Sequence, residues 1–89
     1  MISAIAITAI LSAYPCDTIK KLAYLTMDNR QNGVDLSLML DTANNNKVIE
    51  WVIFKAYEVP IVSQLAKEPV AVEFSNQVYL VCRKQLSSR

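Results

Sequence analysis

Apolar and polar residues alternate in the stretch that follows Gly33, the only glycine in the chain. This period of two is typical of a β-strand with one buried face. Asn32 precedes the glycine, and an Asn-Gly pair favours a tight hairpin turn because both central residues of a type I′ turn need a positive φ. The pattern therefore predicts a β-hairpin that turns at residues 32–33, with four apolar side chains on one face of its second strand: Val34, Leu36, Leu38 and Leu40.

The register of this hairpin separates its apolar and polar side chains. A two-residue turn places Arg30 opposite Asp35 and Met27 opposite Leu38, and a slip of one residue would mix the two faces. A helix over residues 34–43 is the alternative. It gathers its apolar residues on one side but scatters the polar ones around the axis, so the pattern favours the strand.

Residues 46–58 are rich in β-branched and aromatic side chains, which strands favour. The run is apolar at both even and odd positions, with Glu50 inside it, as expected for a central strand covered on both faces. It completes a predicted β-meander over residues 24–57. A helix remains the alternative here, because a short apolar run is not assigned by periodicity alone. Residues 41–47 form a turn cluster, since Asn and Asp tolerate left-handed backbone conformations.

The C-terminal third of the chain predicts a helix and a second hairpin. Pro60 suits the first turn of a short helix over residues 60–67, and Pro69 is expected to stop it. Residues 70–84 are expected to form a β-hairpin that turns at Ser75-Asn76. Residues 85–89 are polar and are expected to form a mobile tail.

Residues 1–14 are apolar, and their isoleucine and leucine residues recur at helical spacing. Pro15 is expected to end this helix, because the residue before a proline is pushed out of the α region. The run has no Lys or Arg before it and is shorter than the roughly 20 residues that span a bilayer. A buried helix is therefore the prediction, and a cleaved or membrane-inserted segment is the alternative.

Together these elements predict one α+β domain over residues 1–89: an N-terminal helix with a five-stranded antiparallel sheet or a small, partly open barrel. The alternative fold has helices over residues 17–27, 34–43 and 46–58 and a hairpin over residues 70–84, which is a winged-helix arrangement. That arrangement would favour DNA binding. Its recognition helix over residues 34–43 has no basic residue to read a groove, so the sheet or barrel is preferred.

The composition predicts surplus apolar surface. Hydrophobic residues make up 53% of the 89 residues and charged residues 19%, and one small core does not bury so much apolar surface. Association with a second copy or with another protein is the natural way to cover it. The expected function is therefore that of a non-enzymatic homo-oligomer, adaptor or inhibitor, with these partner-binding residues: Ile49, Trp51, Ile53 and Tyr79.

The charge balance makes nucleic-acid binding the alternative function. The net charge is +1, with nine basic and eight acidic residues, whereas phosphate neutralisation supplies most of the affinity of nucleic-acid binders. The residues expected to serve this alternative are two basic pairs: Lys20 with Lys21, and Arg83 with Lys84.

Candidate chemistry is sparse. The chain has no histidine, which removes the commonest general base and metal ligand, and one glycine cannot build a phosphate-binding loop. No catalytic residue, metal or cofactor is predicted, and the carboxylates are interpreted as solvated surface. Cys16 and Cys82 are expected to be free, buried thiols in a reducing cytoplasm. A disulfide between them is the alternative for an exported protein.

Overall fold

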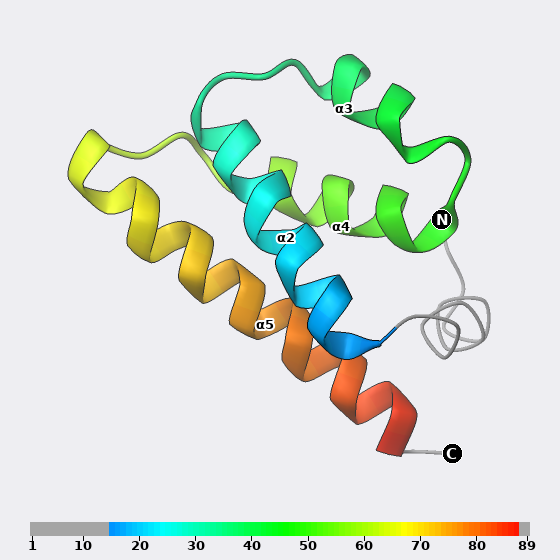
Figure 1. Ribbon diagram of the computed structural model, residues 1–89. Helices are drawn as coiled ribbons and strands as arrows, with labels where there is room; N and C mark the ends of the chain where they lie inside the picture. The colour runs from blue at the N-terminus through cyan, green and yellow to red at the C-terminus, as the bar shows by residue number, and fades with distance from the viewer. Residues whose placement is uncertain (1–14, 88–89) are drawn as a thin grey trace.

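Residues 15–87 are the part of the chain that this computed structural model describes, and they form helices joined by short loops (Figure 1). No residue in this range lies in a β-strand. The predicted five-stranded antiparallel sheet or barrel is therefore wrong, as is the hairpin of the winged-helix alternative. The helix predicted over residues 1–14 lies outside the described residues. The elements are α2 (Cys16–Gln31), α3 (Leu36–Ala43), α4 (Lys47–Tyr57), the 3₁₀ turn η1 (Gln64–Ala66) and α5 (Lys67–Ser87).

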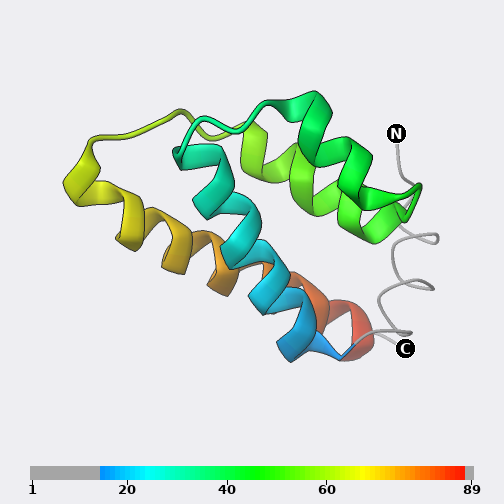
Figure 2. The same cartoon turned by 45° about the horizontal axis from the view of Figure 1, so that its top comes forward.

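Helix α2 is the centre of the arrangement. It runs antiparallel to α5 and packs closely along it, and its other flank packs on α4 (Figures 1 and 2). Helix α3 packs on α4, on the side away from α5. Helices α4 and α5 both pack against α2, and they approach each other less closely than either approaches α2.

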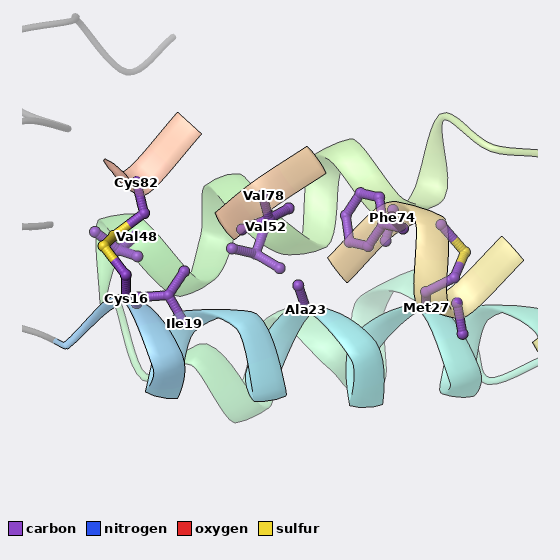
Figure 3. Close-up of a cluster of buried hydrophobic side chains, with 11 residues drawn as sticks. Cys16, Ile19, Ala23, Met27, Val48, Val52, Phe74, Val78 and Cys82 are labelled. Atoms are coloured by element: carbon purple, nitrogen blue, oxygen red, sulfur yellow. A yellow bond between two sulfur atoms is a disulfide. The ribbon is translucent and has the colours of Figure 1, made fainter. Parts of the chain in front are cut away.

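The main core lies where α2, α4 and α5 meet. Figure 3 shows Ala23 of α2 facing Val52 of α4 and Val78 of α5, with Met27 beside Phe74 further along. A smaller core joins α3 to α4. It consists of Met39, Ala43 and Ile53. All these side chains are buried. Among the helices of residues 15–87, α4 alone contributes buried side chains to both cores.

The turn at residues 32–33 exists, but it ends a helix and does not close a hairpin. Helix α2 continues through Gln31, with Asn32 as its C-cap, and Gly33 has a φ of +82°. The N–H of Gly33 donates to the Arg30 carbonyl at 3.1 Å, and the N–H of Val34 donates to the Asn29 carbonyl at 3.0 Å. A left-handed glycine of this kind commonly closes the C-terminus of a helix. The signal located the turn and misjudged the element before it.

Helix α3 overturns the predicted strand over residues 34–40. Its buried residues are Met39 and Ala43, one helical turn apart, whereas Leu36 and Leu38 are exposed. Two of the four alternating residues, Leu36 and Leu38, are thus on the solvent side of the helix, whereas Val34 and Leu40 pack against the small core. The side chain of Asp35 caps α3 by accepting from the N–H of Ser37 at 3.1 Å. The hydroxyl of Ser37 and then this N–H lower the pKa of Asp35.

Helix α4 replaces the predicted central strand of the β-meander. Its buried residues, Val48, Val52, Ile53 and Ala56, recur at helical spacing. The side chain of Asn46 caps the helix by accepting from the N–H groups of Val48 and Ile49 at 3.0 and 3.1 Å. Asn44 and Asn45 before it have φ values of 51° and 64°. The turn predicted over residues 41–47 is therefore present but shorter, because residues 41–43 belong to α3 and Lys47 to α4.

Helix α5 replaces the second hairpin. Pro69 lies in its first turn, where a missing N–H costs nothing, and Ser75 lies in its middle with its hydroxyl donating to the Val72 carbonyl at 2.7 Å. The short helix predicted over residues 60–67 is wrong in its first half: residues 60–63 lie in no helix, η1 covers Gln64–Ala66, and α5 begins at Lys67. Helix α5 ends at Ser87, so residues 85–87 of the predicted tail are helical, and residues 88–89 lie outside the described range.

A disulfide joins the start of α2 to the last part of α5. The Sγ atoms of Cys16 and Cys82 are 2.05 Å apart, and the bond links residues 66 positions apart in sequence (Figure 3). The expectation of two free thiols is wrong, and the alternative pairing is the one observed. Both cysteines are buried beside Ile19 and Val48, so the bond also completes the main core.

Candidate functional site

An apolar groove runs between α4 and α5. Its volume is about 220 Å³. Trp51 and Lys55 line it from α4, and the residues from α5 are Phe74, Gln77, Val78 and Val81. The groove exists because α4 and α5 both pack on α2 and leave a gap above the shared core. Its floor is therefore apolar, and Lys55 and Gln77 supply its polar rim.

Trp51 is the aromatic centre of this groove. It is half-buried and packs against the main core, and it is the only tryptophan in the chain. Phe54 follows it by one turn of α4, so the two aromatic rings are neighbours on the helix surface. The Phe54 side chain is 47% exposed. Large aromatic side chains beside a groove are typical of protein contact surfaces.

The four residues expected to bind a partner do not lie on one face of the molecule. Ile53 is fully buried and Ile49 packs against the small core on α3, whereas Trp51 faces α5. Residues two positions apart point to different sides of a helix, so the face expected from a strand does not exist. Tyr79 lies on α5 and contacts Lys20 and Arg83, on the flank away from the groove.

The residues expected to bind nucleic acid are brought together in part. The Lys20 ammonium lies 5.5 Å from the centre of the Tyr79 ring, and the Arg83 guanidinium lies 6.0 Å from it. Lys20 and Lys21 line a cleft of about 500 Å³ between α2 and α5. Lys84 is exposed and is not among the residues that line this cleft.

Acidic groups share this cleft with the lysines. Asp17 lines it together with Lys20 and Lys21, and its other residues are Tyr24, Val72, Ser75 and Asn76. The Tyr24 hydroxyl donates a hydrogen bond to the Glu68 carboxylate. This bond is the main cause that raises the pKa of Tyr24, with desolvation second. The surface is therefore of mixed charge and not a continuous basic patch.

A third feature, which no sequence pattern indicated, is the loop between α4 and η1, over residues 58–63. The Gln31 side chain is 1% exposed and contacts this segment with both ends of its amide. Its Nε2 donates to the Pro60 carbonyl at 3.0 Å, and its Oε1 accepts from the Val62 N–H at 2.8 Å. The Nε of Arg30 donates to the Val59 carbonyl at 3.0 Å. The end of α2 thus fixes the path of residues 59–62.

Tyr57 supports the same region from α4. Its hydroxyl donates to the Val34 carbonyl at 2.6 Å, and its ring lies under the Arg30 guanidinium, 5.1 Å from ring centre to Cζ. Burial raises the pKa of Tyr57, and the Arg30 charge opposes that shift. Arg30 is consequently held between a ring and a carbonyl, which favours a fixed position for its side chain.

The described residues were also compared with the requirements of a metal site and of a membrane-spanning helix, and the chain with known proteins. Between residues 15 and 87 no three His, Cys, Asp or Glu side chains are placed to bind a metal ion together. Within the same range, no helix combines the length and apolar character needed to cross a bilayer. Comparisons of the chain with protein-family models, with curated proteins and with solved structures each found no match.

Proposed function

We propose that this protein is non-enzymatic and acts by protein–protein association, with the groove between α4 and α5 as its contact surface. The observation that carries this proposal is the position of Trp51, half-buried across the groove from Phe74, Val78 and Val81. A hydrophobic floor with a polar rim is the usual anatomy of a protein interface. A helix that packs into such a groove places its apolar residues on one face.

The proposed partner is a second copy of the chain. Phe54 lies on the same side of α4 as Trp51 and is 47% exposed, so a two-fold arrangement inserts Phe54 of each copy into the groove of the other. Such an interface is self-complementary, as closed dimers require. It also buries aromatic surface that a monomer leaves in water, which is the expected source of its affinity.

The test is a dilution series followed by light scattering and by Trp51 fluorescence. The wild-type protein is expected to change from dimer to monomer on dilution, with a red shift of emission as the groove becomes hydrated. Phe54→Asp should weaken the dimer by about 30-fold or more, which is the effect of losing an interface hot spot. Because Phe54 is exposed, this variant is expected to keep its fold.

Leu38→Asp is the matched control. Leu38 is 60% exposed on α3, away from the groove, so the same change of charge there should leave the dimer intact. A wild-type protein that stays monomeric at every concentration would overturn self-association. Equal weakening by both variants would show that net charge, and not the groove, controls assembly.

The disulfide bears on the compartment in which the protein works. A disulfide between buried cysteines persists in oxidising compartments and is rare where thiol reductants are abundant. The cytoplasmic location expected from the sequence stays an untested prediction. We favour an oxidising compartment instead, because the Cys16–Cys82 bond also completes the main core.

Nucleic-acid binding is the second candidate function, and the grouping of Lys20, Lys21 and Arg83 around Tyr79 favours it. Cations beside an aromatic ring suit single strands, whose bases stack and whose phosphates need neutralising. Asp17 and Glu68 on the same flank oppose it. Binding to a labelled oligonucleotide that weakens steeply with salt and is lost in Lys20→Glu would support this function. No binding at low salt would exclude it.

A further inference from the structure

The segment between α4 and η1 displays an apolar side chain on a backbone held from behind. Residues 60–63 lie in no helix or strand, and Ser63 at their end has an extended backbone, with φ −63° and ψ 158°. Ile61 is 52% exposed, and Leu65 beyond it is 93% exposed. Such large apolar side chains would lie in water unless a partner covers them. Figure 1 shows this connection at the end of the molecule away from the C-terminus of α5.

Gln31 bonds to both neighbours of Ile61 and leaves Ile61 itself open. Its amide donates to the Pro60 carbonyl and accepts from the Val62 N–H. Within the described residues, the N–H and C=O of Ile61 make no hydrogen bond. The residue therefore offers an exposed side chain and two free backbone groups between two anchored positions.

This arrangement has the properties of a peptide prepared for a substrate cleft. Endopeptidases bind an extended chain, place the side chain before the cleaved bond in a specificity pocket, and bond to the backbone around it. Ordering a flexible peptide costs free energy, and a segment already held in the bound form avoids that cost. Pro60, with its fixed φ, and the Gln31 bridge both hold the segment in this way.

We propose that residues 59–63 form an inhibitory loop that occupies the substrate cleft of an endopeptidase, with Ile61 in the specificity pocket. The pocket that fits this side chain is one that takes branched aliphatic residues. The Ile61–Val62 bond lies across the active site, and Gln31 holds the residues on both sides of Ile61. This contact uses neither Trp51 nor Phe54, so it is independent of the groove.

The test pairs two endopeptidases of known specificity with matched variants. An elastase that cleaves after branched aliphatic residues is expected to be inhibited competitively by the wild-type protein. Trypsin, whose pocket carries an aspartate, is not. Ile61→Arg should reverse this pattern by inhibiting trypsin and losing at least about 30-fold in its affinity for elastase.

Leu80→Arg is the control for the specificity change. Leu80 lies on α5 and is 52% exposed, the same fraction as Ile61, so it adds the same charge at an equally open position. It should leave both inhibition constants unchanged. The matched pairs are the wild-type protein with elastase and Ile61→Arg with trypsin. Inhibition of either enzyme by its matched chain, and not by the other chain, supports the inhibitory loop. The proposal is overturned if neither matched pair inhibits, or if Leu80→Arg inhibits trypsin as well as Ile61→Arg does.

Gln31→Leu tests the role of the anchored backbone. It keeps the volume of the side chain but removes both bonds to the segment, so the loop should still enter the cleft but be cut after residue 61. Mass spectrometry after incubation with elastase detects the cut, and circular dichroism checks that the helices remain. Inhibition by Gln31→Leu as strong as that by the wild-type protein, with no cleavage, would show that anchoring has no part in the activity.

Discussion

The two ends of α2 are held by different means. At its first residue, Cys16 is covalently joined to Cys82 near the end of α5. At its last residue, Gln31 is joined by hydrogen bonds to the segment that leads into η1 and α5. Both connections tie the same antiparallel pair of helices, one by a redox-sensitive bond and the other by a neutral amide.

The difference shows that the pairing of α2 with α5 and the backbone path of residues 60–62 are fixed by separate contacts. A disulfide acts mainly on the unfolded chain, whose entropy it reduces, and it imposes little on the backbone between its ends. Hydrogen bonds from Gln31 reach individual carbonyl and N–H groups, so they specify the path of residues 60–62. We therefore expect the disulfide end to contribute more stability and the Gln31 end to contribute more local order.

Reduction of the disulfide should have the largest effect. The Cys16–Cys82 bond joins residues that are 66 positions apart. A disulfide that closes a loop of this length is expected to contribute about 4 kcal/mol to the free energy of unfolding. Urea unfolding with and without dithiothreitol measures this contribution. The Cys16→Ala, Cys82→Ala double variant should match the reduced protein and should not respond to dithiothreitol. Equal unfolding midpoints for the oxidised and reduced protein would contradict this ranking of the two ends.

Gln31→Leu should have the next largest effect. It leaves the Pro60 carbonyl and the Val62 N–H without their partner, and about 2 kcal/mol is the expected loss of unfolding free energy. Hydrogen exchange should become faster at Val62, while the amides of α2 near the disulfide keep their protection. Gln64→Leu, at an exposed position in η1, is the control and should change neither quantity. Uniformly faster exchange in both regions would contradict separate control of the two ends.

Gly33→Val should have the smallest effect of the three. The φ of +82° strains any residue with a Cβ, but no atom lies within 4 Å of the position of an added Cβ. The cost of the substitution is therefore the conformational cost of a positive φ alone. The expected loss of unfolding free energy is about 1–2 kcal/mol. Gly33→Asn should lose less, because asparagine tolerates this conformation. If the two variants lose the same amount, the preference of the residue for a positive φ does not set the cost.

The sequence located the breaks in the chain better than the elements between them. Asn32-Gly33 and residues 44–46, which lie within the turn cluster predicted over residues 41–47, are outside the helices. Such residues act through local backbone preferences, which the rest of the fold does not change. The two prolines are the exceptions: Pro60 was expected in the first turn of a helix and lies outside one, whereas Pro69 was expected to stop a helix and lies in the first turn of α5. The sequence contained no distinction between these two positions.

The helices were misjudged because exposed apolar residues imitated a strand. Leu36 and Leu38 are on the solvent side of α3 and yet contributed to the alternating pattern. In α4, the apolar residues that face α3 and those that face α5 together cover both parities, as they would in a strand buried on two faces. A helix that serves two cores loses the one-sided pattern from which helices are recognised.

The candidate sites were predictable only in part. Trp51 was predicted to bind a partner, and the structure places it in the lining of the groove. Its role in binding stays a prediction. The Gln31 contacts could not be found in the sequence. Its partners are backbone atoms 29 and 31 positions away, and a backbone group carries no residue-type signal.

The disulfide also makes the chain a closed ring from residue 16 to residue 82, with every loop of the described fold inside it. A single peptide-bond cut within that ring produces two new ends but no separate fragment. The segment over residues 59–63 is therefore the kind of place at which the oxidised molecule tolerates a nick. After a cut there, the Cys16–Cys82 bond would still join the two fragments.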